Sequence, residues 1–138
     1  REYDLLAKTV YYLNAADRII KDKYVKPVRD IFVKYSNAIE YAFGEKVVMD
    51  PNFNVRFEQN GVERSEAYLS SGQKGVCAFC FRLALLENMY SKEKPFLILD
   101  DPFVFLDEEN HQKIKELLNS LAAYFQIIYF TCHTSRKI

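Results

Sequence analysis

The chain has 138 residues, 49% apolar and 28% charged, a balance typical of one globular domain rather than of a disordered tail. Nineteen Lys and Arg balance nineteen Asp and Glu, and this zero formal net charge removes the strong basic field that a self-sufficient DNA-binding domain carries. No apolar run approaches the roughly 18 residues of a membrane span and no signal-peptide core is present, so we expect a cytoplasmic protein without a membrane partner.

The three cysteines, Cys77, Cys80 and Cys132, lie within apolar runs, which favours reduced thiols used as small core residues over a disulfide framework. Cys77 and Cys80 also form a C-x-x-C pattern, which Cys132 and His133 would complete as a four-ligand zinc site. We favour the core interpretation, because the pair falls in the middle of an apolar helix. The chain begins with Arg1 rather than Met, as expected for a piece of a longer protein.

Residues 1–44 are predicted to form a helical arm. Over residues 6–24 the apolar positions alternate at spacings of three and four, which indicates either the end of a coiled coil or an amphipathic helix packed on its own domain. Pro27 is expected to break this helix and begin a second one, because proline lacks an amide donor but suits a first helical turn. The second helix presents an apolar face as far as Phe43, and Gly44 is expected to end it in a left-handed cap.

Residues 45–138 are predicted to form an α/β lobe that begins with a small antiparallel sheet. Apolar residues over 47–49, and their alternation over 53–57, indicate two strands. Asn60-Gly61 is a typical hairpin dipeptide, and it leads into a third extended segment over 62–69.

The remainder of the lobe is predicted to be a strand–helix–strand crossover packed on a central helix. The helix over 74–90 is apolar nearly all round, which indicates burial on most sides. The runs 96–99 and 127–130 are wholly apolar, the pattern of parallel strands covered on both faces. An amphipathic helix over 107–124 joins them, with His111 expected on its exposed face.

A polar motif, Ser70-Ser71-Gly72-Gln73, opens the central helix after Leu69. A Ser-Ser-Gly turn at a helix N-terminus presents backbone amides, hydroxyls and the positive end of the helix dipole, which together suit a phosphate. The alternative is a plain serine cap ahead of a core helix, because serine is a common N-cap residue.

Asp100 and Asp101 end the first apolar strand, where open parallel sheets place their ligand sites. One carboxylate is suited to Mg²⁺ and the other to orienting an attacking water, but an Asp-Asp-Pro turn is the alternative. His133 ends the second strand and would lie beside these carboxylates if the two strands are neighbours in one parallel sheet.

Taken together, these motifs resemble the second half of an ABC-type ATPase head over about residues 47–133. Leu69–Gln73 is similar to the signature sequence, Phe96–Asp101 to the Walker B strand, Phe105–Asp107 to the D-loop and His133 to the switch histidine. The helical arm further resembles the SMC-like and SbcC-like chromosome and DNA-repair ATPases. The resemblance implies the C-terminal lobe of such a head, an α/β fold with parallel strands, flanking helices, a small hairpin and a coiled-coil-like arm.

The resemblance also implies ATP and Mg²⁺ as cofactors and gives each motif a role. Asp101 and His133 would be catalytic, and Asp100 would hold Mg²⁺ through water. Nucleotide contacts would come from Ser70, Ser71, Gly72, Gln73 and Asp107. The implied partners are the protein's own N-terminal P-loop lobe, a second ATPase head, a nuclease subunit and DNA bound through the assembled complex.

Three departures from the family pattern qualify these expectations. Asp101 stands at the usual glutamate position and is one methylene shorter, which predicts slow hydrolysis or a differently placed water. Ser71 replaces the usual first glycine of the signature pair. None of the four glycines begins a P-loop, so the chain alone should not hold ATP in the family's manner. The signature residues would then act on a nucleotide bound to the opposite head, and Asp100, Asp101 and His133 on one bound within their own head.

A second function remains open from the sequence, a non-catalytic interaction module. In it the helical arm and the Asn60-Gly61 hairpin would dock a partner, and the ATPase residues would be structural relics. Substitution of Asp100 or Asp101 separates the two hypotheses, because only an ATPase would lose turnover.

Overall fold

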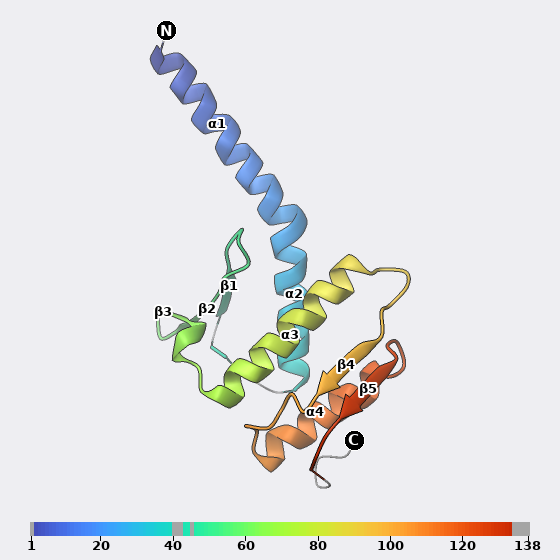
Figure 1. Ribbon diagram of the computed structural model, residues 1–138. Coiled ribbons are helices and arrows are strands. Elements are labelled where there is room, and N and C mark those ends of the chain that lie inside the picture. Colours follow the sequence, from blue (N-terminus) through green and yellow to red (C-terminus); the bar gives the residue numbers. More distant parts are fainter. Residues whose placement is uncertain (1, 40–42, 45, 134–138) are drawn as a thin grey trace.

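The computed structural model describes residues 2–39, 43–44 and 46–133, and Figure 1 shows a long helical arm leading into an α/β lobe. Among the described residues, none of the helices has both the length and the apolar character that crossing a bilayer requires. The elements in chain order are α1 (Glu2–Ile20), the π-helical turn η1 (Lys21–Val25), α2 (Lys26–Ala38), β1 (Lys46–Met49), β2 (Val55–Gln59), β3 (Val62–Ser65), the 3-10 turn η2 (Glu66–Tyr68), α3 (Ser71–Met89), β4 (Leu97–Asp100), α4 (Glu108–Leu121) and β5 (Ile127–Phe130).

The described part of the arm is helical from Glu2 to Ala38. The predicted second helix begins at Lys26 with Pro27 in its first turn, but the predicted interruption of the helix there is wrong. Pro27 lies in the first turn of α2, directly after the π-helical turn η1, and the residues on either side of that junction keep helical dihedral angles. The altered hydrogen-bond pattern of a π turn lets the helix pass a residue that cannot donate. The apolar residues of α1 are exposed, Leu6 and Leu13 by 64% each, so α1 does not pack on its own lobe. This exposure favours the coiled-coil interpretation of the repeat.

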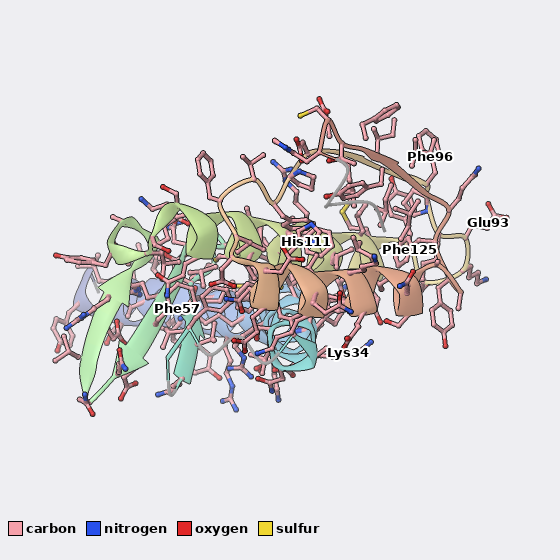
Figure 2. All side chains as sticks on the ribbon, turned by 90° about the horizontal axis from the view of Figure 1, so that it is seen from below. Lys34, Phe57, Glu93, Phe96, His111 and Phe125 are labelled. Carbon is pink, nitrogen blue, oxygen red and sulfur yellow. The ribbon has the colours of Figure 1, made fainter. Side chains whose placement is uncertain are left out.

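The core is centred on the contact between α2 and α3, and Figure 2 shows the side chains drawn on the whole fold. Phe32 of α2 is completely buried, as are Val76 and Cys80 of α3. Removing a side chain of this size from water contributes roughly 1.5–3 kcal/mol. The predicted burial of the central helix is confirmed for the side that faces the core, but Ala78, Arg82 and Met89 are exposed, so the helix is not covered on most sides.

The N-terminal part of the lobe is the antiparallel sheet β1-β2-β3. Asn60 and Gly61 both have positive φ, 52° and 73°, as a type I′ hairpin turn requires, so the predicted hairpin is confirmed. Gly44 does not form the predicted left-handed cap. Gly44 instead allows the backbone at this position to lie close to β2, because a Cβ here would lie 2.7 Å from the carbonyl oxygen of Glu58.

β2 begins two residues later than the alternation over 53–57 predicts. Phe53 adopts a left-handed conformation with φ 62°, which keeps it out of the extended strand that follows. The cause is the Asp50 carboxylate, which accepts the backbone N–H groups of Asn52 and Asn54 at 2.8 and 3.0 Å and so forms a turn around Phe53. The side chain of Phe53 still packs near Phe81 of α3, with 6.3 Å between the ring centroids.

β4 and β5 pair in parallel, which confirms the predicted crossover through α4. The expectation that both faces of this pair are covered is wrong. Leu97 faces the core, whereas Ile98 and Phe130 on the opposite face are exposed by 59% and 54%. α4 covers the inner face, and the described residues contain no element that covers the outer one.

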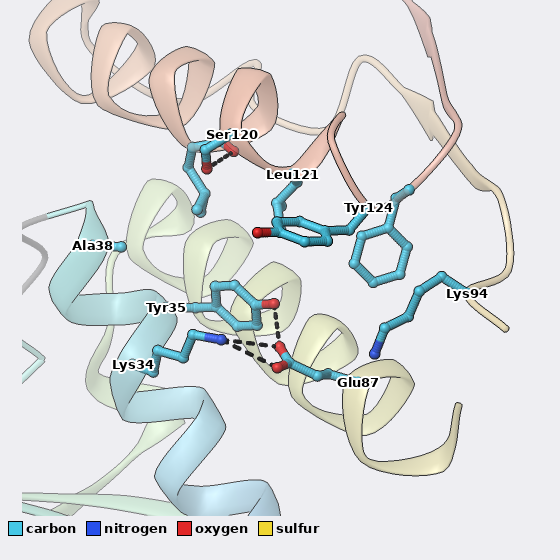
Figure 3. A pocket seen from close by; sticks show the side chains of 10 residues that line it. Lys34, Tyr35, Ala38, Glu87, Lys94, Ser120, Leu121 and Tyr124 are labelled. Atoms are coloured by element: carbon cyan, nitrogen blue, oxygen red, sulfur yellow. Dashed lines mark hydrogen bonds and ion pairs between the residues drawn. The ribbon is translucent and has the colours of Figure 1, made fainter. Parts of the chain in front are cut away.

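A polar contact joins α2 to α3 at the edge of the core, within the cavity of Figure 3. The Glu87 carboxylate accepts hydrogen bonds from the hydroxyl of Tyr35 and from Lys34 Nζ, the latter at 3.1 Å. Burial alone would raise the pKa of Glu87, but these hydrogen bonds and the charges of Lys34 and Lys94 outweigh it, so the pKa is lowered. Burial, together with the neighbouring carboxylate, raises the pKa of Tyr35.

These opposite pKa shifts predict a pH window for stability. The Glu87 contribution is complete above its ordinary pKa of about 4.3 and is lost as pH falls through the lower folded value, and the Tyr35 contribution is lost above about pH 10. Glu87→Gln should flatten the acid side of a stability profile measured by urea unfolding. Glu93→Gln, at an exposed glutamate, is the control. Parallel acid profiles for wild type and Glu87→Gln would contradict this role.

Candidate functional site

The predicted phosphate-binding motif forms the start of α3. Ser70 is the N-cap, its Oγ accepts the backbone N–H of Gln73 at 3.2 Å, and Gln73 Oε1 accepts the backbone N–H of Ser70 at 2.8 Å. This is the complete capping box, so the structural role offered as the alternative is present. The motif can still bind an anion, because the Ser70 hydroxyl and the Gln73 side-chain amide have protons to donate. Ser71 is exposed beside them.

Gly72 fixes the start of α3 against the predicted D-loop segment. A Cβ at Gly72 would lie 2.9 Å from the backbone oxygen of Phe105 and 3.3 Å from Leu106. Two residues farther on, Asp107 caps α4, and its carboxylate accepts the backbone N–H of Asn110 at 2.8 Å. The predicted signature and D-loop residues are therefore held together by backbone contact, and the Asp107 carboxylate has a structural role.

The chain turns sharply where β4 ends. Asp101 has a φ of 40°, an uncommon value for a non-glycine residue, while its N–H still donates to the Phe130 carbonyl at 2.8 Å. The turn sends the two adjacent carboxylates to different surroundings. Asp100 lies at the end of an exposed groove between α3 and β4, a groove also lined by Arg82 and Phe96. Asp101 is turned toward the segment that follows β5.

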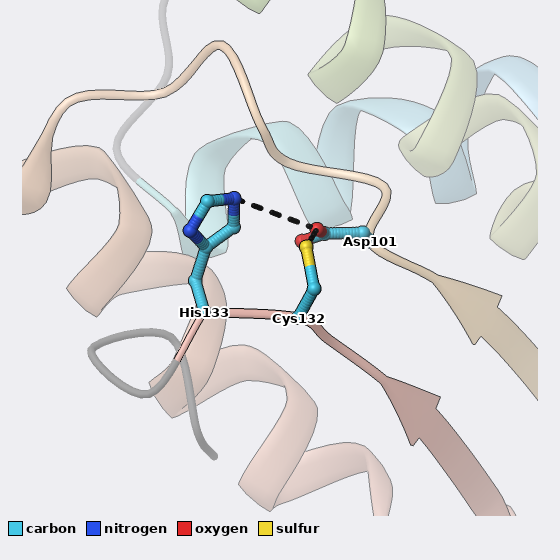
Figure 4. A group of neighbouring side chains, drawn as sticks. All are labelled: Asp101, Cys132 and His133. Atoms are coloured by element: carbon cyan, nitrogen blue, oxygen red, sulfur yellow. Dashed lines mark hydrogen bonds and ion pairs between the residues drawn. The ribbon is translucent and has the colours of Figure 1, made fainter.

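Asp101 and His133 meet at the carboxyl ends of the parallel strands, as their order predicts, and Figure 4 shows Cys132 beside the Asp101 carboxylate. His133 Nε2 lies 3.9 Å from Asp101 Oδ2, and the Cys132 thiol donates to the same oxygen at 3.2 Å. Thr131 Oγ1 lies 3.3 Å from Asp101 Oδ1 and accepts the backbone N–H of His133 at 3.1 Å. The side chain of Asp101 is only 17% exposed, whereas that of His133 is 49% exposed.

The expectation that the cysteines are core residues is confirmed for Cys77 and Cys80 and wrong for Cys132, and the expectation that His111 is exposed is also wrong. Cys132 is exposed because it lies two residues beyond Phe130, the last residue of β5, where the sheet no longer covers it. Cys77 and Cys80 are core residues, and burial raises the pKa of each to about 12. Among the described residues, neither joins Cys132 in a group of metal ligands, so the four-ligand zinc site is not formed. His111 is 5% exposed, because the first turn of α4 packs against the core.

Comparison with known proteins identifies relatives of this chain, although no protein-family model matches it. The Rad50 ATPase for DNA double-strand break repair from Methanocaldococcus jannaschii is 29% identical over 137 residues, which cover 96% of this chain and 13% of that protein. The corresponding protein of Archaeoglobus fulgidus is 42% identical over 57 residues, 41% of this chain and 6% of the relative.

Solved structures agree with these relatives at the level of the fold. The structure of an SMC ATPase, described for its ATP-driven dimerization and DNA-stimulated activation, superposes with a TM-score of 0.63 at 16% identity, covering 89% of this chain and 74% of that one. The Smc head domain from Pyrococcus furiosus, bound to the C-terminal domain of ScpA, gives a TM-score of 0.59 at 15% identity, with 94% and 35% covered.

The chain resembles the C-terminal part of an SMC/Rad50-type ATPase head. The predicted α/β fold and the resemblance to SMC-like ATPases are confirmed. The chain spans about one eighth of the length of the Methanocaldococcus Rad50 ATPase. The roles of Ser70, Gln73, Asp100, Asp101 and His133 in this Rad50-like lobe stay predictions.

Two glycines in the first turns of α3 should respond in opposite ways to alanine. Gly72→Ala places a methyl group against the Phe105 carbonyl and should cost about 1–3 kcal/mol of stability. Gly75→Ala meets only an ordinary contact, 3.6 Å from the oxygen of Pro102, and should gain up to about 1 kcal/mol from helix propensity. Urea unfolding of both variants tests this difference, and an equal effect at the two positions would contradict the close contact at Gly72.

Proposed function

We propose that this chain is the C-terminal half of a cytoplasmic ATPase head that binds and hydrolyses MgATP once it is paired with a P-loop lobe. The observation that carries this proposal is the approach of Asp101 to His133 at the carboxyl ends of parallel strands, with 3.9 Å between Oδ2 and Nε2. This is the edge of an α/β sheet at which ligands bind. Relatives that are themselves Rad50 ATPases support the assignment.

The uncovered face of the β4-β5 pair supports a partner lobe. Ile98 and Phe130 are exposed beside Phe96, another apolar residue of the same segment, which is 59% exposed. A parallel sheet is normally covered on both faces, and two strands alone leave most of its hydrogen-bonding edges open. The protein's own N-terminal lobe, carrying the P-loop, is the partner that would extend this sheet and cover its outer face.

In this proposal the residues after β4 and β5 divide the chemistry. The Asp101 carboxylate accepts a proton from the attacking water, and His133 donates a hydrogen bond to the γ-phosphate from across the site. Asp100, exposed at the end of β4, is placed to hold Mg²⁺ through water. Bound Mg²⁺ would supply charge neutralisation at the phosphates.

The start of α3 would act on the nucleotide of a second head. Ser70, Ser71, Gly72 and Gln73 present the positive end of a 19-residue helix, which suits the phosphate of an ATP bound elsewhere. Asp107, at the neighbouring segment, would lie near the same interface. ATP would then favour the head dimer only to the extent that it binds the closed state better than the open one.

We further propose a role in DNA repair or DNA end processing. The curated relatives are named for DNA double-strand break repair, and the exposed apolar residues of α1 suit the coiled coil of such a protein. The chain itself has no net charge, so contact with DNA would depend on the assembled complex and on a nuclease subunit within it.

Calorimetric titration of MgATP tests whether the site is split between two lobes. The 138-residue chain alone should show no binding, because the described residues contain no P-loop glycines, and addition of the P-loop lobe of the parent protein should create binding. Asp100→Asn should weaken the dependence on Mg²⁺. Tight binding to the isolated chain would contradict the split site, and binding in neither mixture would favour the interaction module.

Lengthening the proposed base tests its position. Asp101→Glu extends the carboxylate by one methylene toward the water and should raise turnover in the reassembled head, while Asp101→Asn should reduce turnover about 10²-fold or more and leave MgATP bound. Steady-state phosphate release measures both variants. Unchanged turnover in Asp101→Asn would show that this carboxylate is not the base.

A further inference from the structure

Three side chains with different donor atoms converge where β4 and β5 end, and the ATPase chemistry uses only two of them. The ligand atoms of Asp101, Cys132 and His133 all lie within 4.8 Å of one another. Cys132 Sγ is 3.2 Å and His133 Nε2 is 3.9 Å from the same oxygen, Asp101 Oδ2. The thiol has no part in holding ATP or Mg²⁺, yet it lies against the Asp101 carboxylate (Figure 4).

We propose that Asp101, Cys132 and His133 form a binding site for Zn²⁺, with water as the fourth ligand. Thiolate, imidazole and carboxylate are the three side-chain donors that zinc takes, and three protein ligands with one open position make a common arrangement. The thiol proton leaves to solvent as the metal binds. A thiolate and an imidazole favour Zn²⁺ over Mg²⁺, which prefers oxygen ligands, so this site is chemically distinct from the proposed Mg²⁺ position at Asp100.

The geometry is close to what tetrahedral zinc requires. Metal–ligand bonds of about 2.0–2.3 Å place neighbouring ligand atoms about 3.3–3.6 Å apart, compared with the 3.2 and 3.9 Å found from Asp101 to Cys132 and His133. The remaining separation, between Cys132 Sγ and a ring nitrogen of His133, is at most 4.8 Å, and rotation of these two side chains would shorten it. Cys132 and His133 are both exposed, so this rotation displaces water rather than core side chains.

The surroundings orient the ligands before a metal arrives. Thr131 Oγ1 lies 3.3 Å from Asp101 Oδ1, the carboxylate oxygen that does not face Cys132 and His133. The same hydroxyl accepts the backbone N–H of His133 at 3.1 Å, which bends the chain back toward Asp101. Partners of this kind, which hold a ligand without touching the metal, commonly change metal affinity 10–100-fold when removed, by the general behaviour of such sites.

Zinc at this position would also compete with nucleotide hydrolysis, a consequence that rests on the proposed function. The carboxylate oxygen bound to zinc cannot accept the proton of an attacking water, and a Nε2 atom bound to zinc cannot donate a hydrogen bond to a phosphate. Zinc binding itself requires neither ATP nor a partner lobe, so it can be measured even if the chain proves not to belong to an ATPase.

Titration of Co²⁺ into the 138-residue chain, without nucleotide and with a non-thiol reductant, tests the site directly. Thiolate coordination should give a charge-transfer absorption band, and added Zn²⁺ should abolish it by displacement. Cys132→Ser should lose the band, and calorimetry should show Zn²⁺ binding at least about tenfold weaker in Cys132→Ser and in His133→Ala. Both residues are exposed, and circular dichroism checks that the variants remain folded.

Cys77→Ala is the matched control, because it removes a thiol from the core and leaves all three proposed ligands in place. Its band should equal that of the wild type. A band that persists in Cys132→Ser and disappears in Cys77→Ala would place the metal on α3 and overturn the proposal. The absence of any thiolate band in the wild-type chain, or unchanged Zn²⁺ affinity in Cys132→Ser, would overturn it as well.

Discussion

The burial of α3 is the constraint on which the rest of this structure depends. One side of the helix packs on α2 through residues such as Phe32 and Cys80, and its N-terminus is fixed by the contact between Gly72 and Phe105. A helix held in this way cannot slide or rotate without opening the core, since protein interiors are close-packed. The position of its capped N-terminus is therefore set partly by apolar packing at Cys80, ten residues from the N-cap Ser70. An anion site built on that end inherits the rigidity of the core.

The positions of Asp100 and Asp101 depend on the parallel strands β4 and β5 rather than on α3. β4 and β5 run side by side, and the left-handed turn at Asp101 directs one carboxylate toward Thr131 and His133 while Asp100 stays at the groove. Backbone strain at a functional position is tolerated where surrounding contacts hold it, and here the N–H of Asp101 is fixed on Phe130. Polar residues thus gather at two places, the N-terminus of α3 and the carboxyl ends of β4 and β5. The segment between β4 and α4 joins them, because it contacts Gly72.

Local sequence patterns were sufficient for most elements of the fold. The hairpin at Asn60-Gly61 and the parallel strand pair follow from turn chemistry and apolar runs, and both are present. The wrong predictions have causes that residue patterns do not contain. Helical continuity past Pro27 depends on a π turn. The exposure of Ile98 depends on which element covers the outer face of the sheet. Residue types at strand ends brought Asp101 and His133 into the predicted site. The exposure of Cys132 could not be read from its apolar neighbours, because it depends on the strand ending two residues earlier, at Phe130.

The continuity of the arm has a mechanical consequence. α1, η1 and α2 form one rod whose base is the completely buried Phe32, so a tilt of α2 within the lobe is carried outward without an intervening joint of loop. At 1.5 Å per residue, the stretch from Glu2 to Phe32 makes a lever of about 45 Å. A rotation of about 10° at its base would sweep the far end through about 8 Å. Packing changes too small to disturb the core would thereby be amplified into a displacement larger than a helical turn.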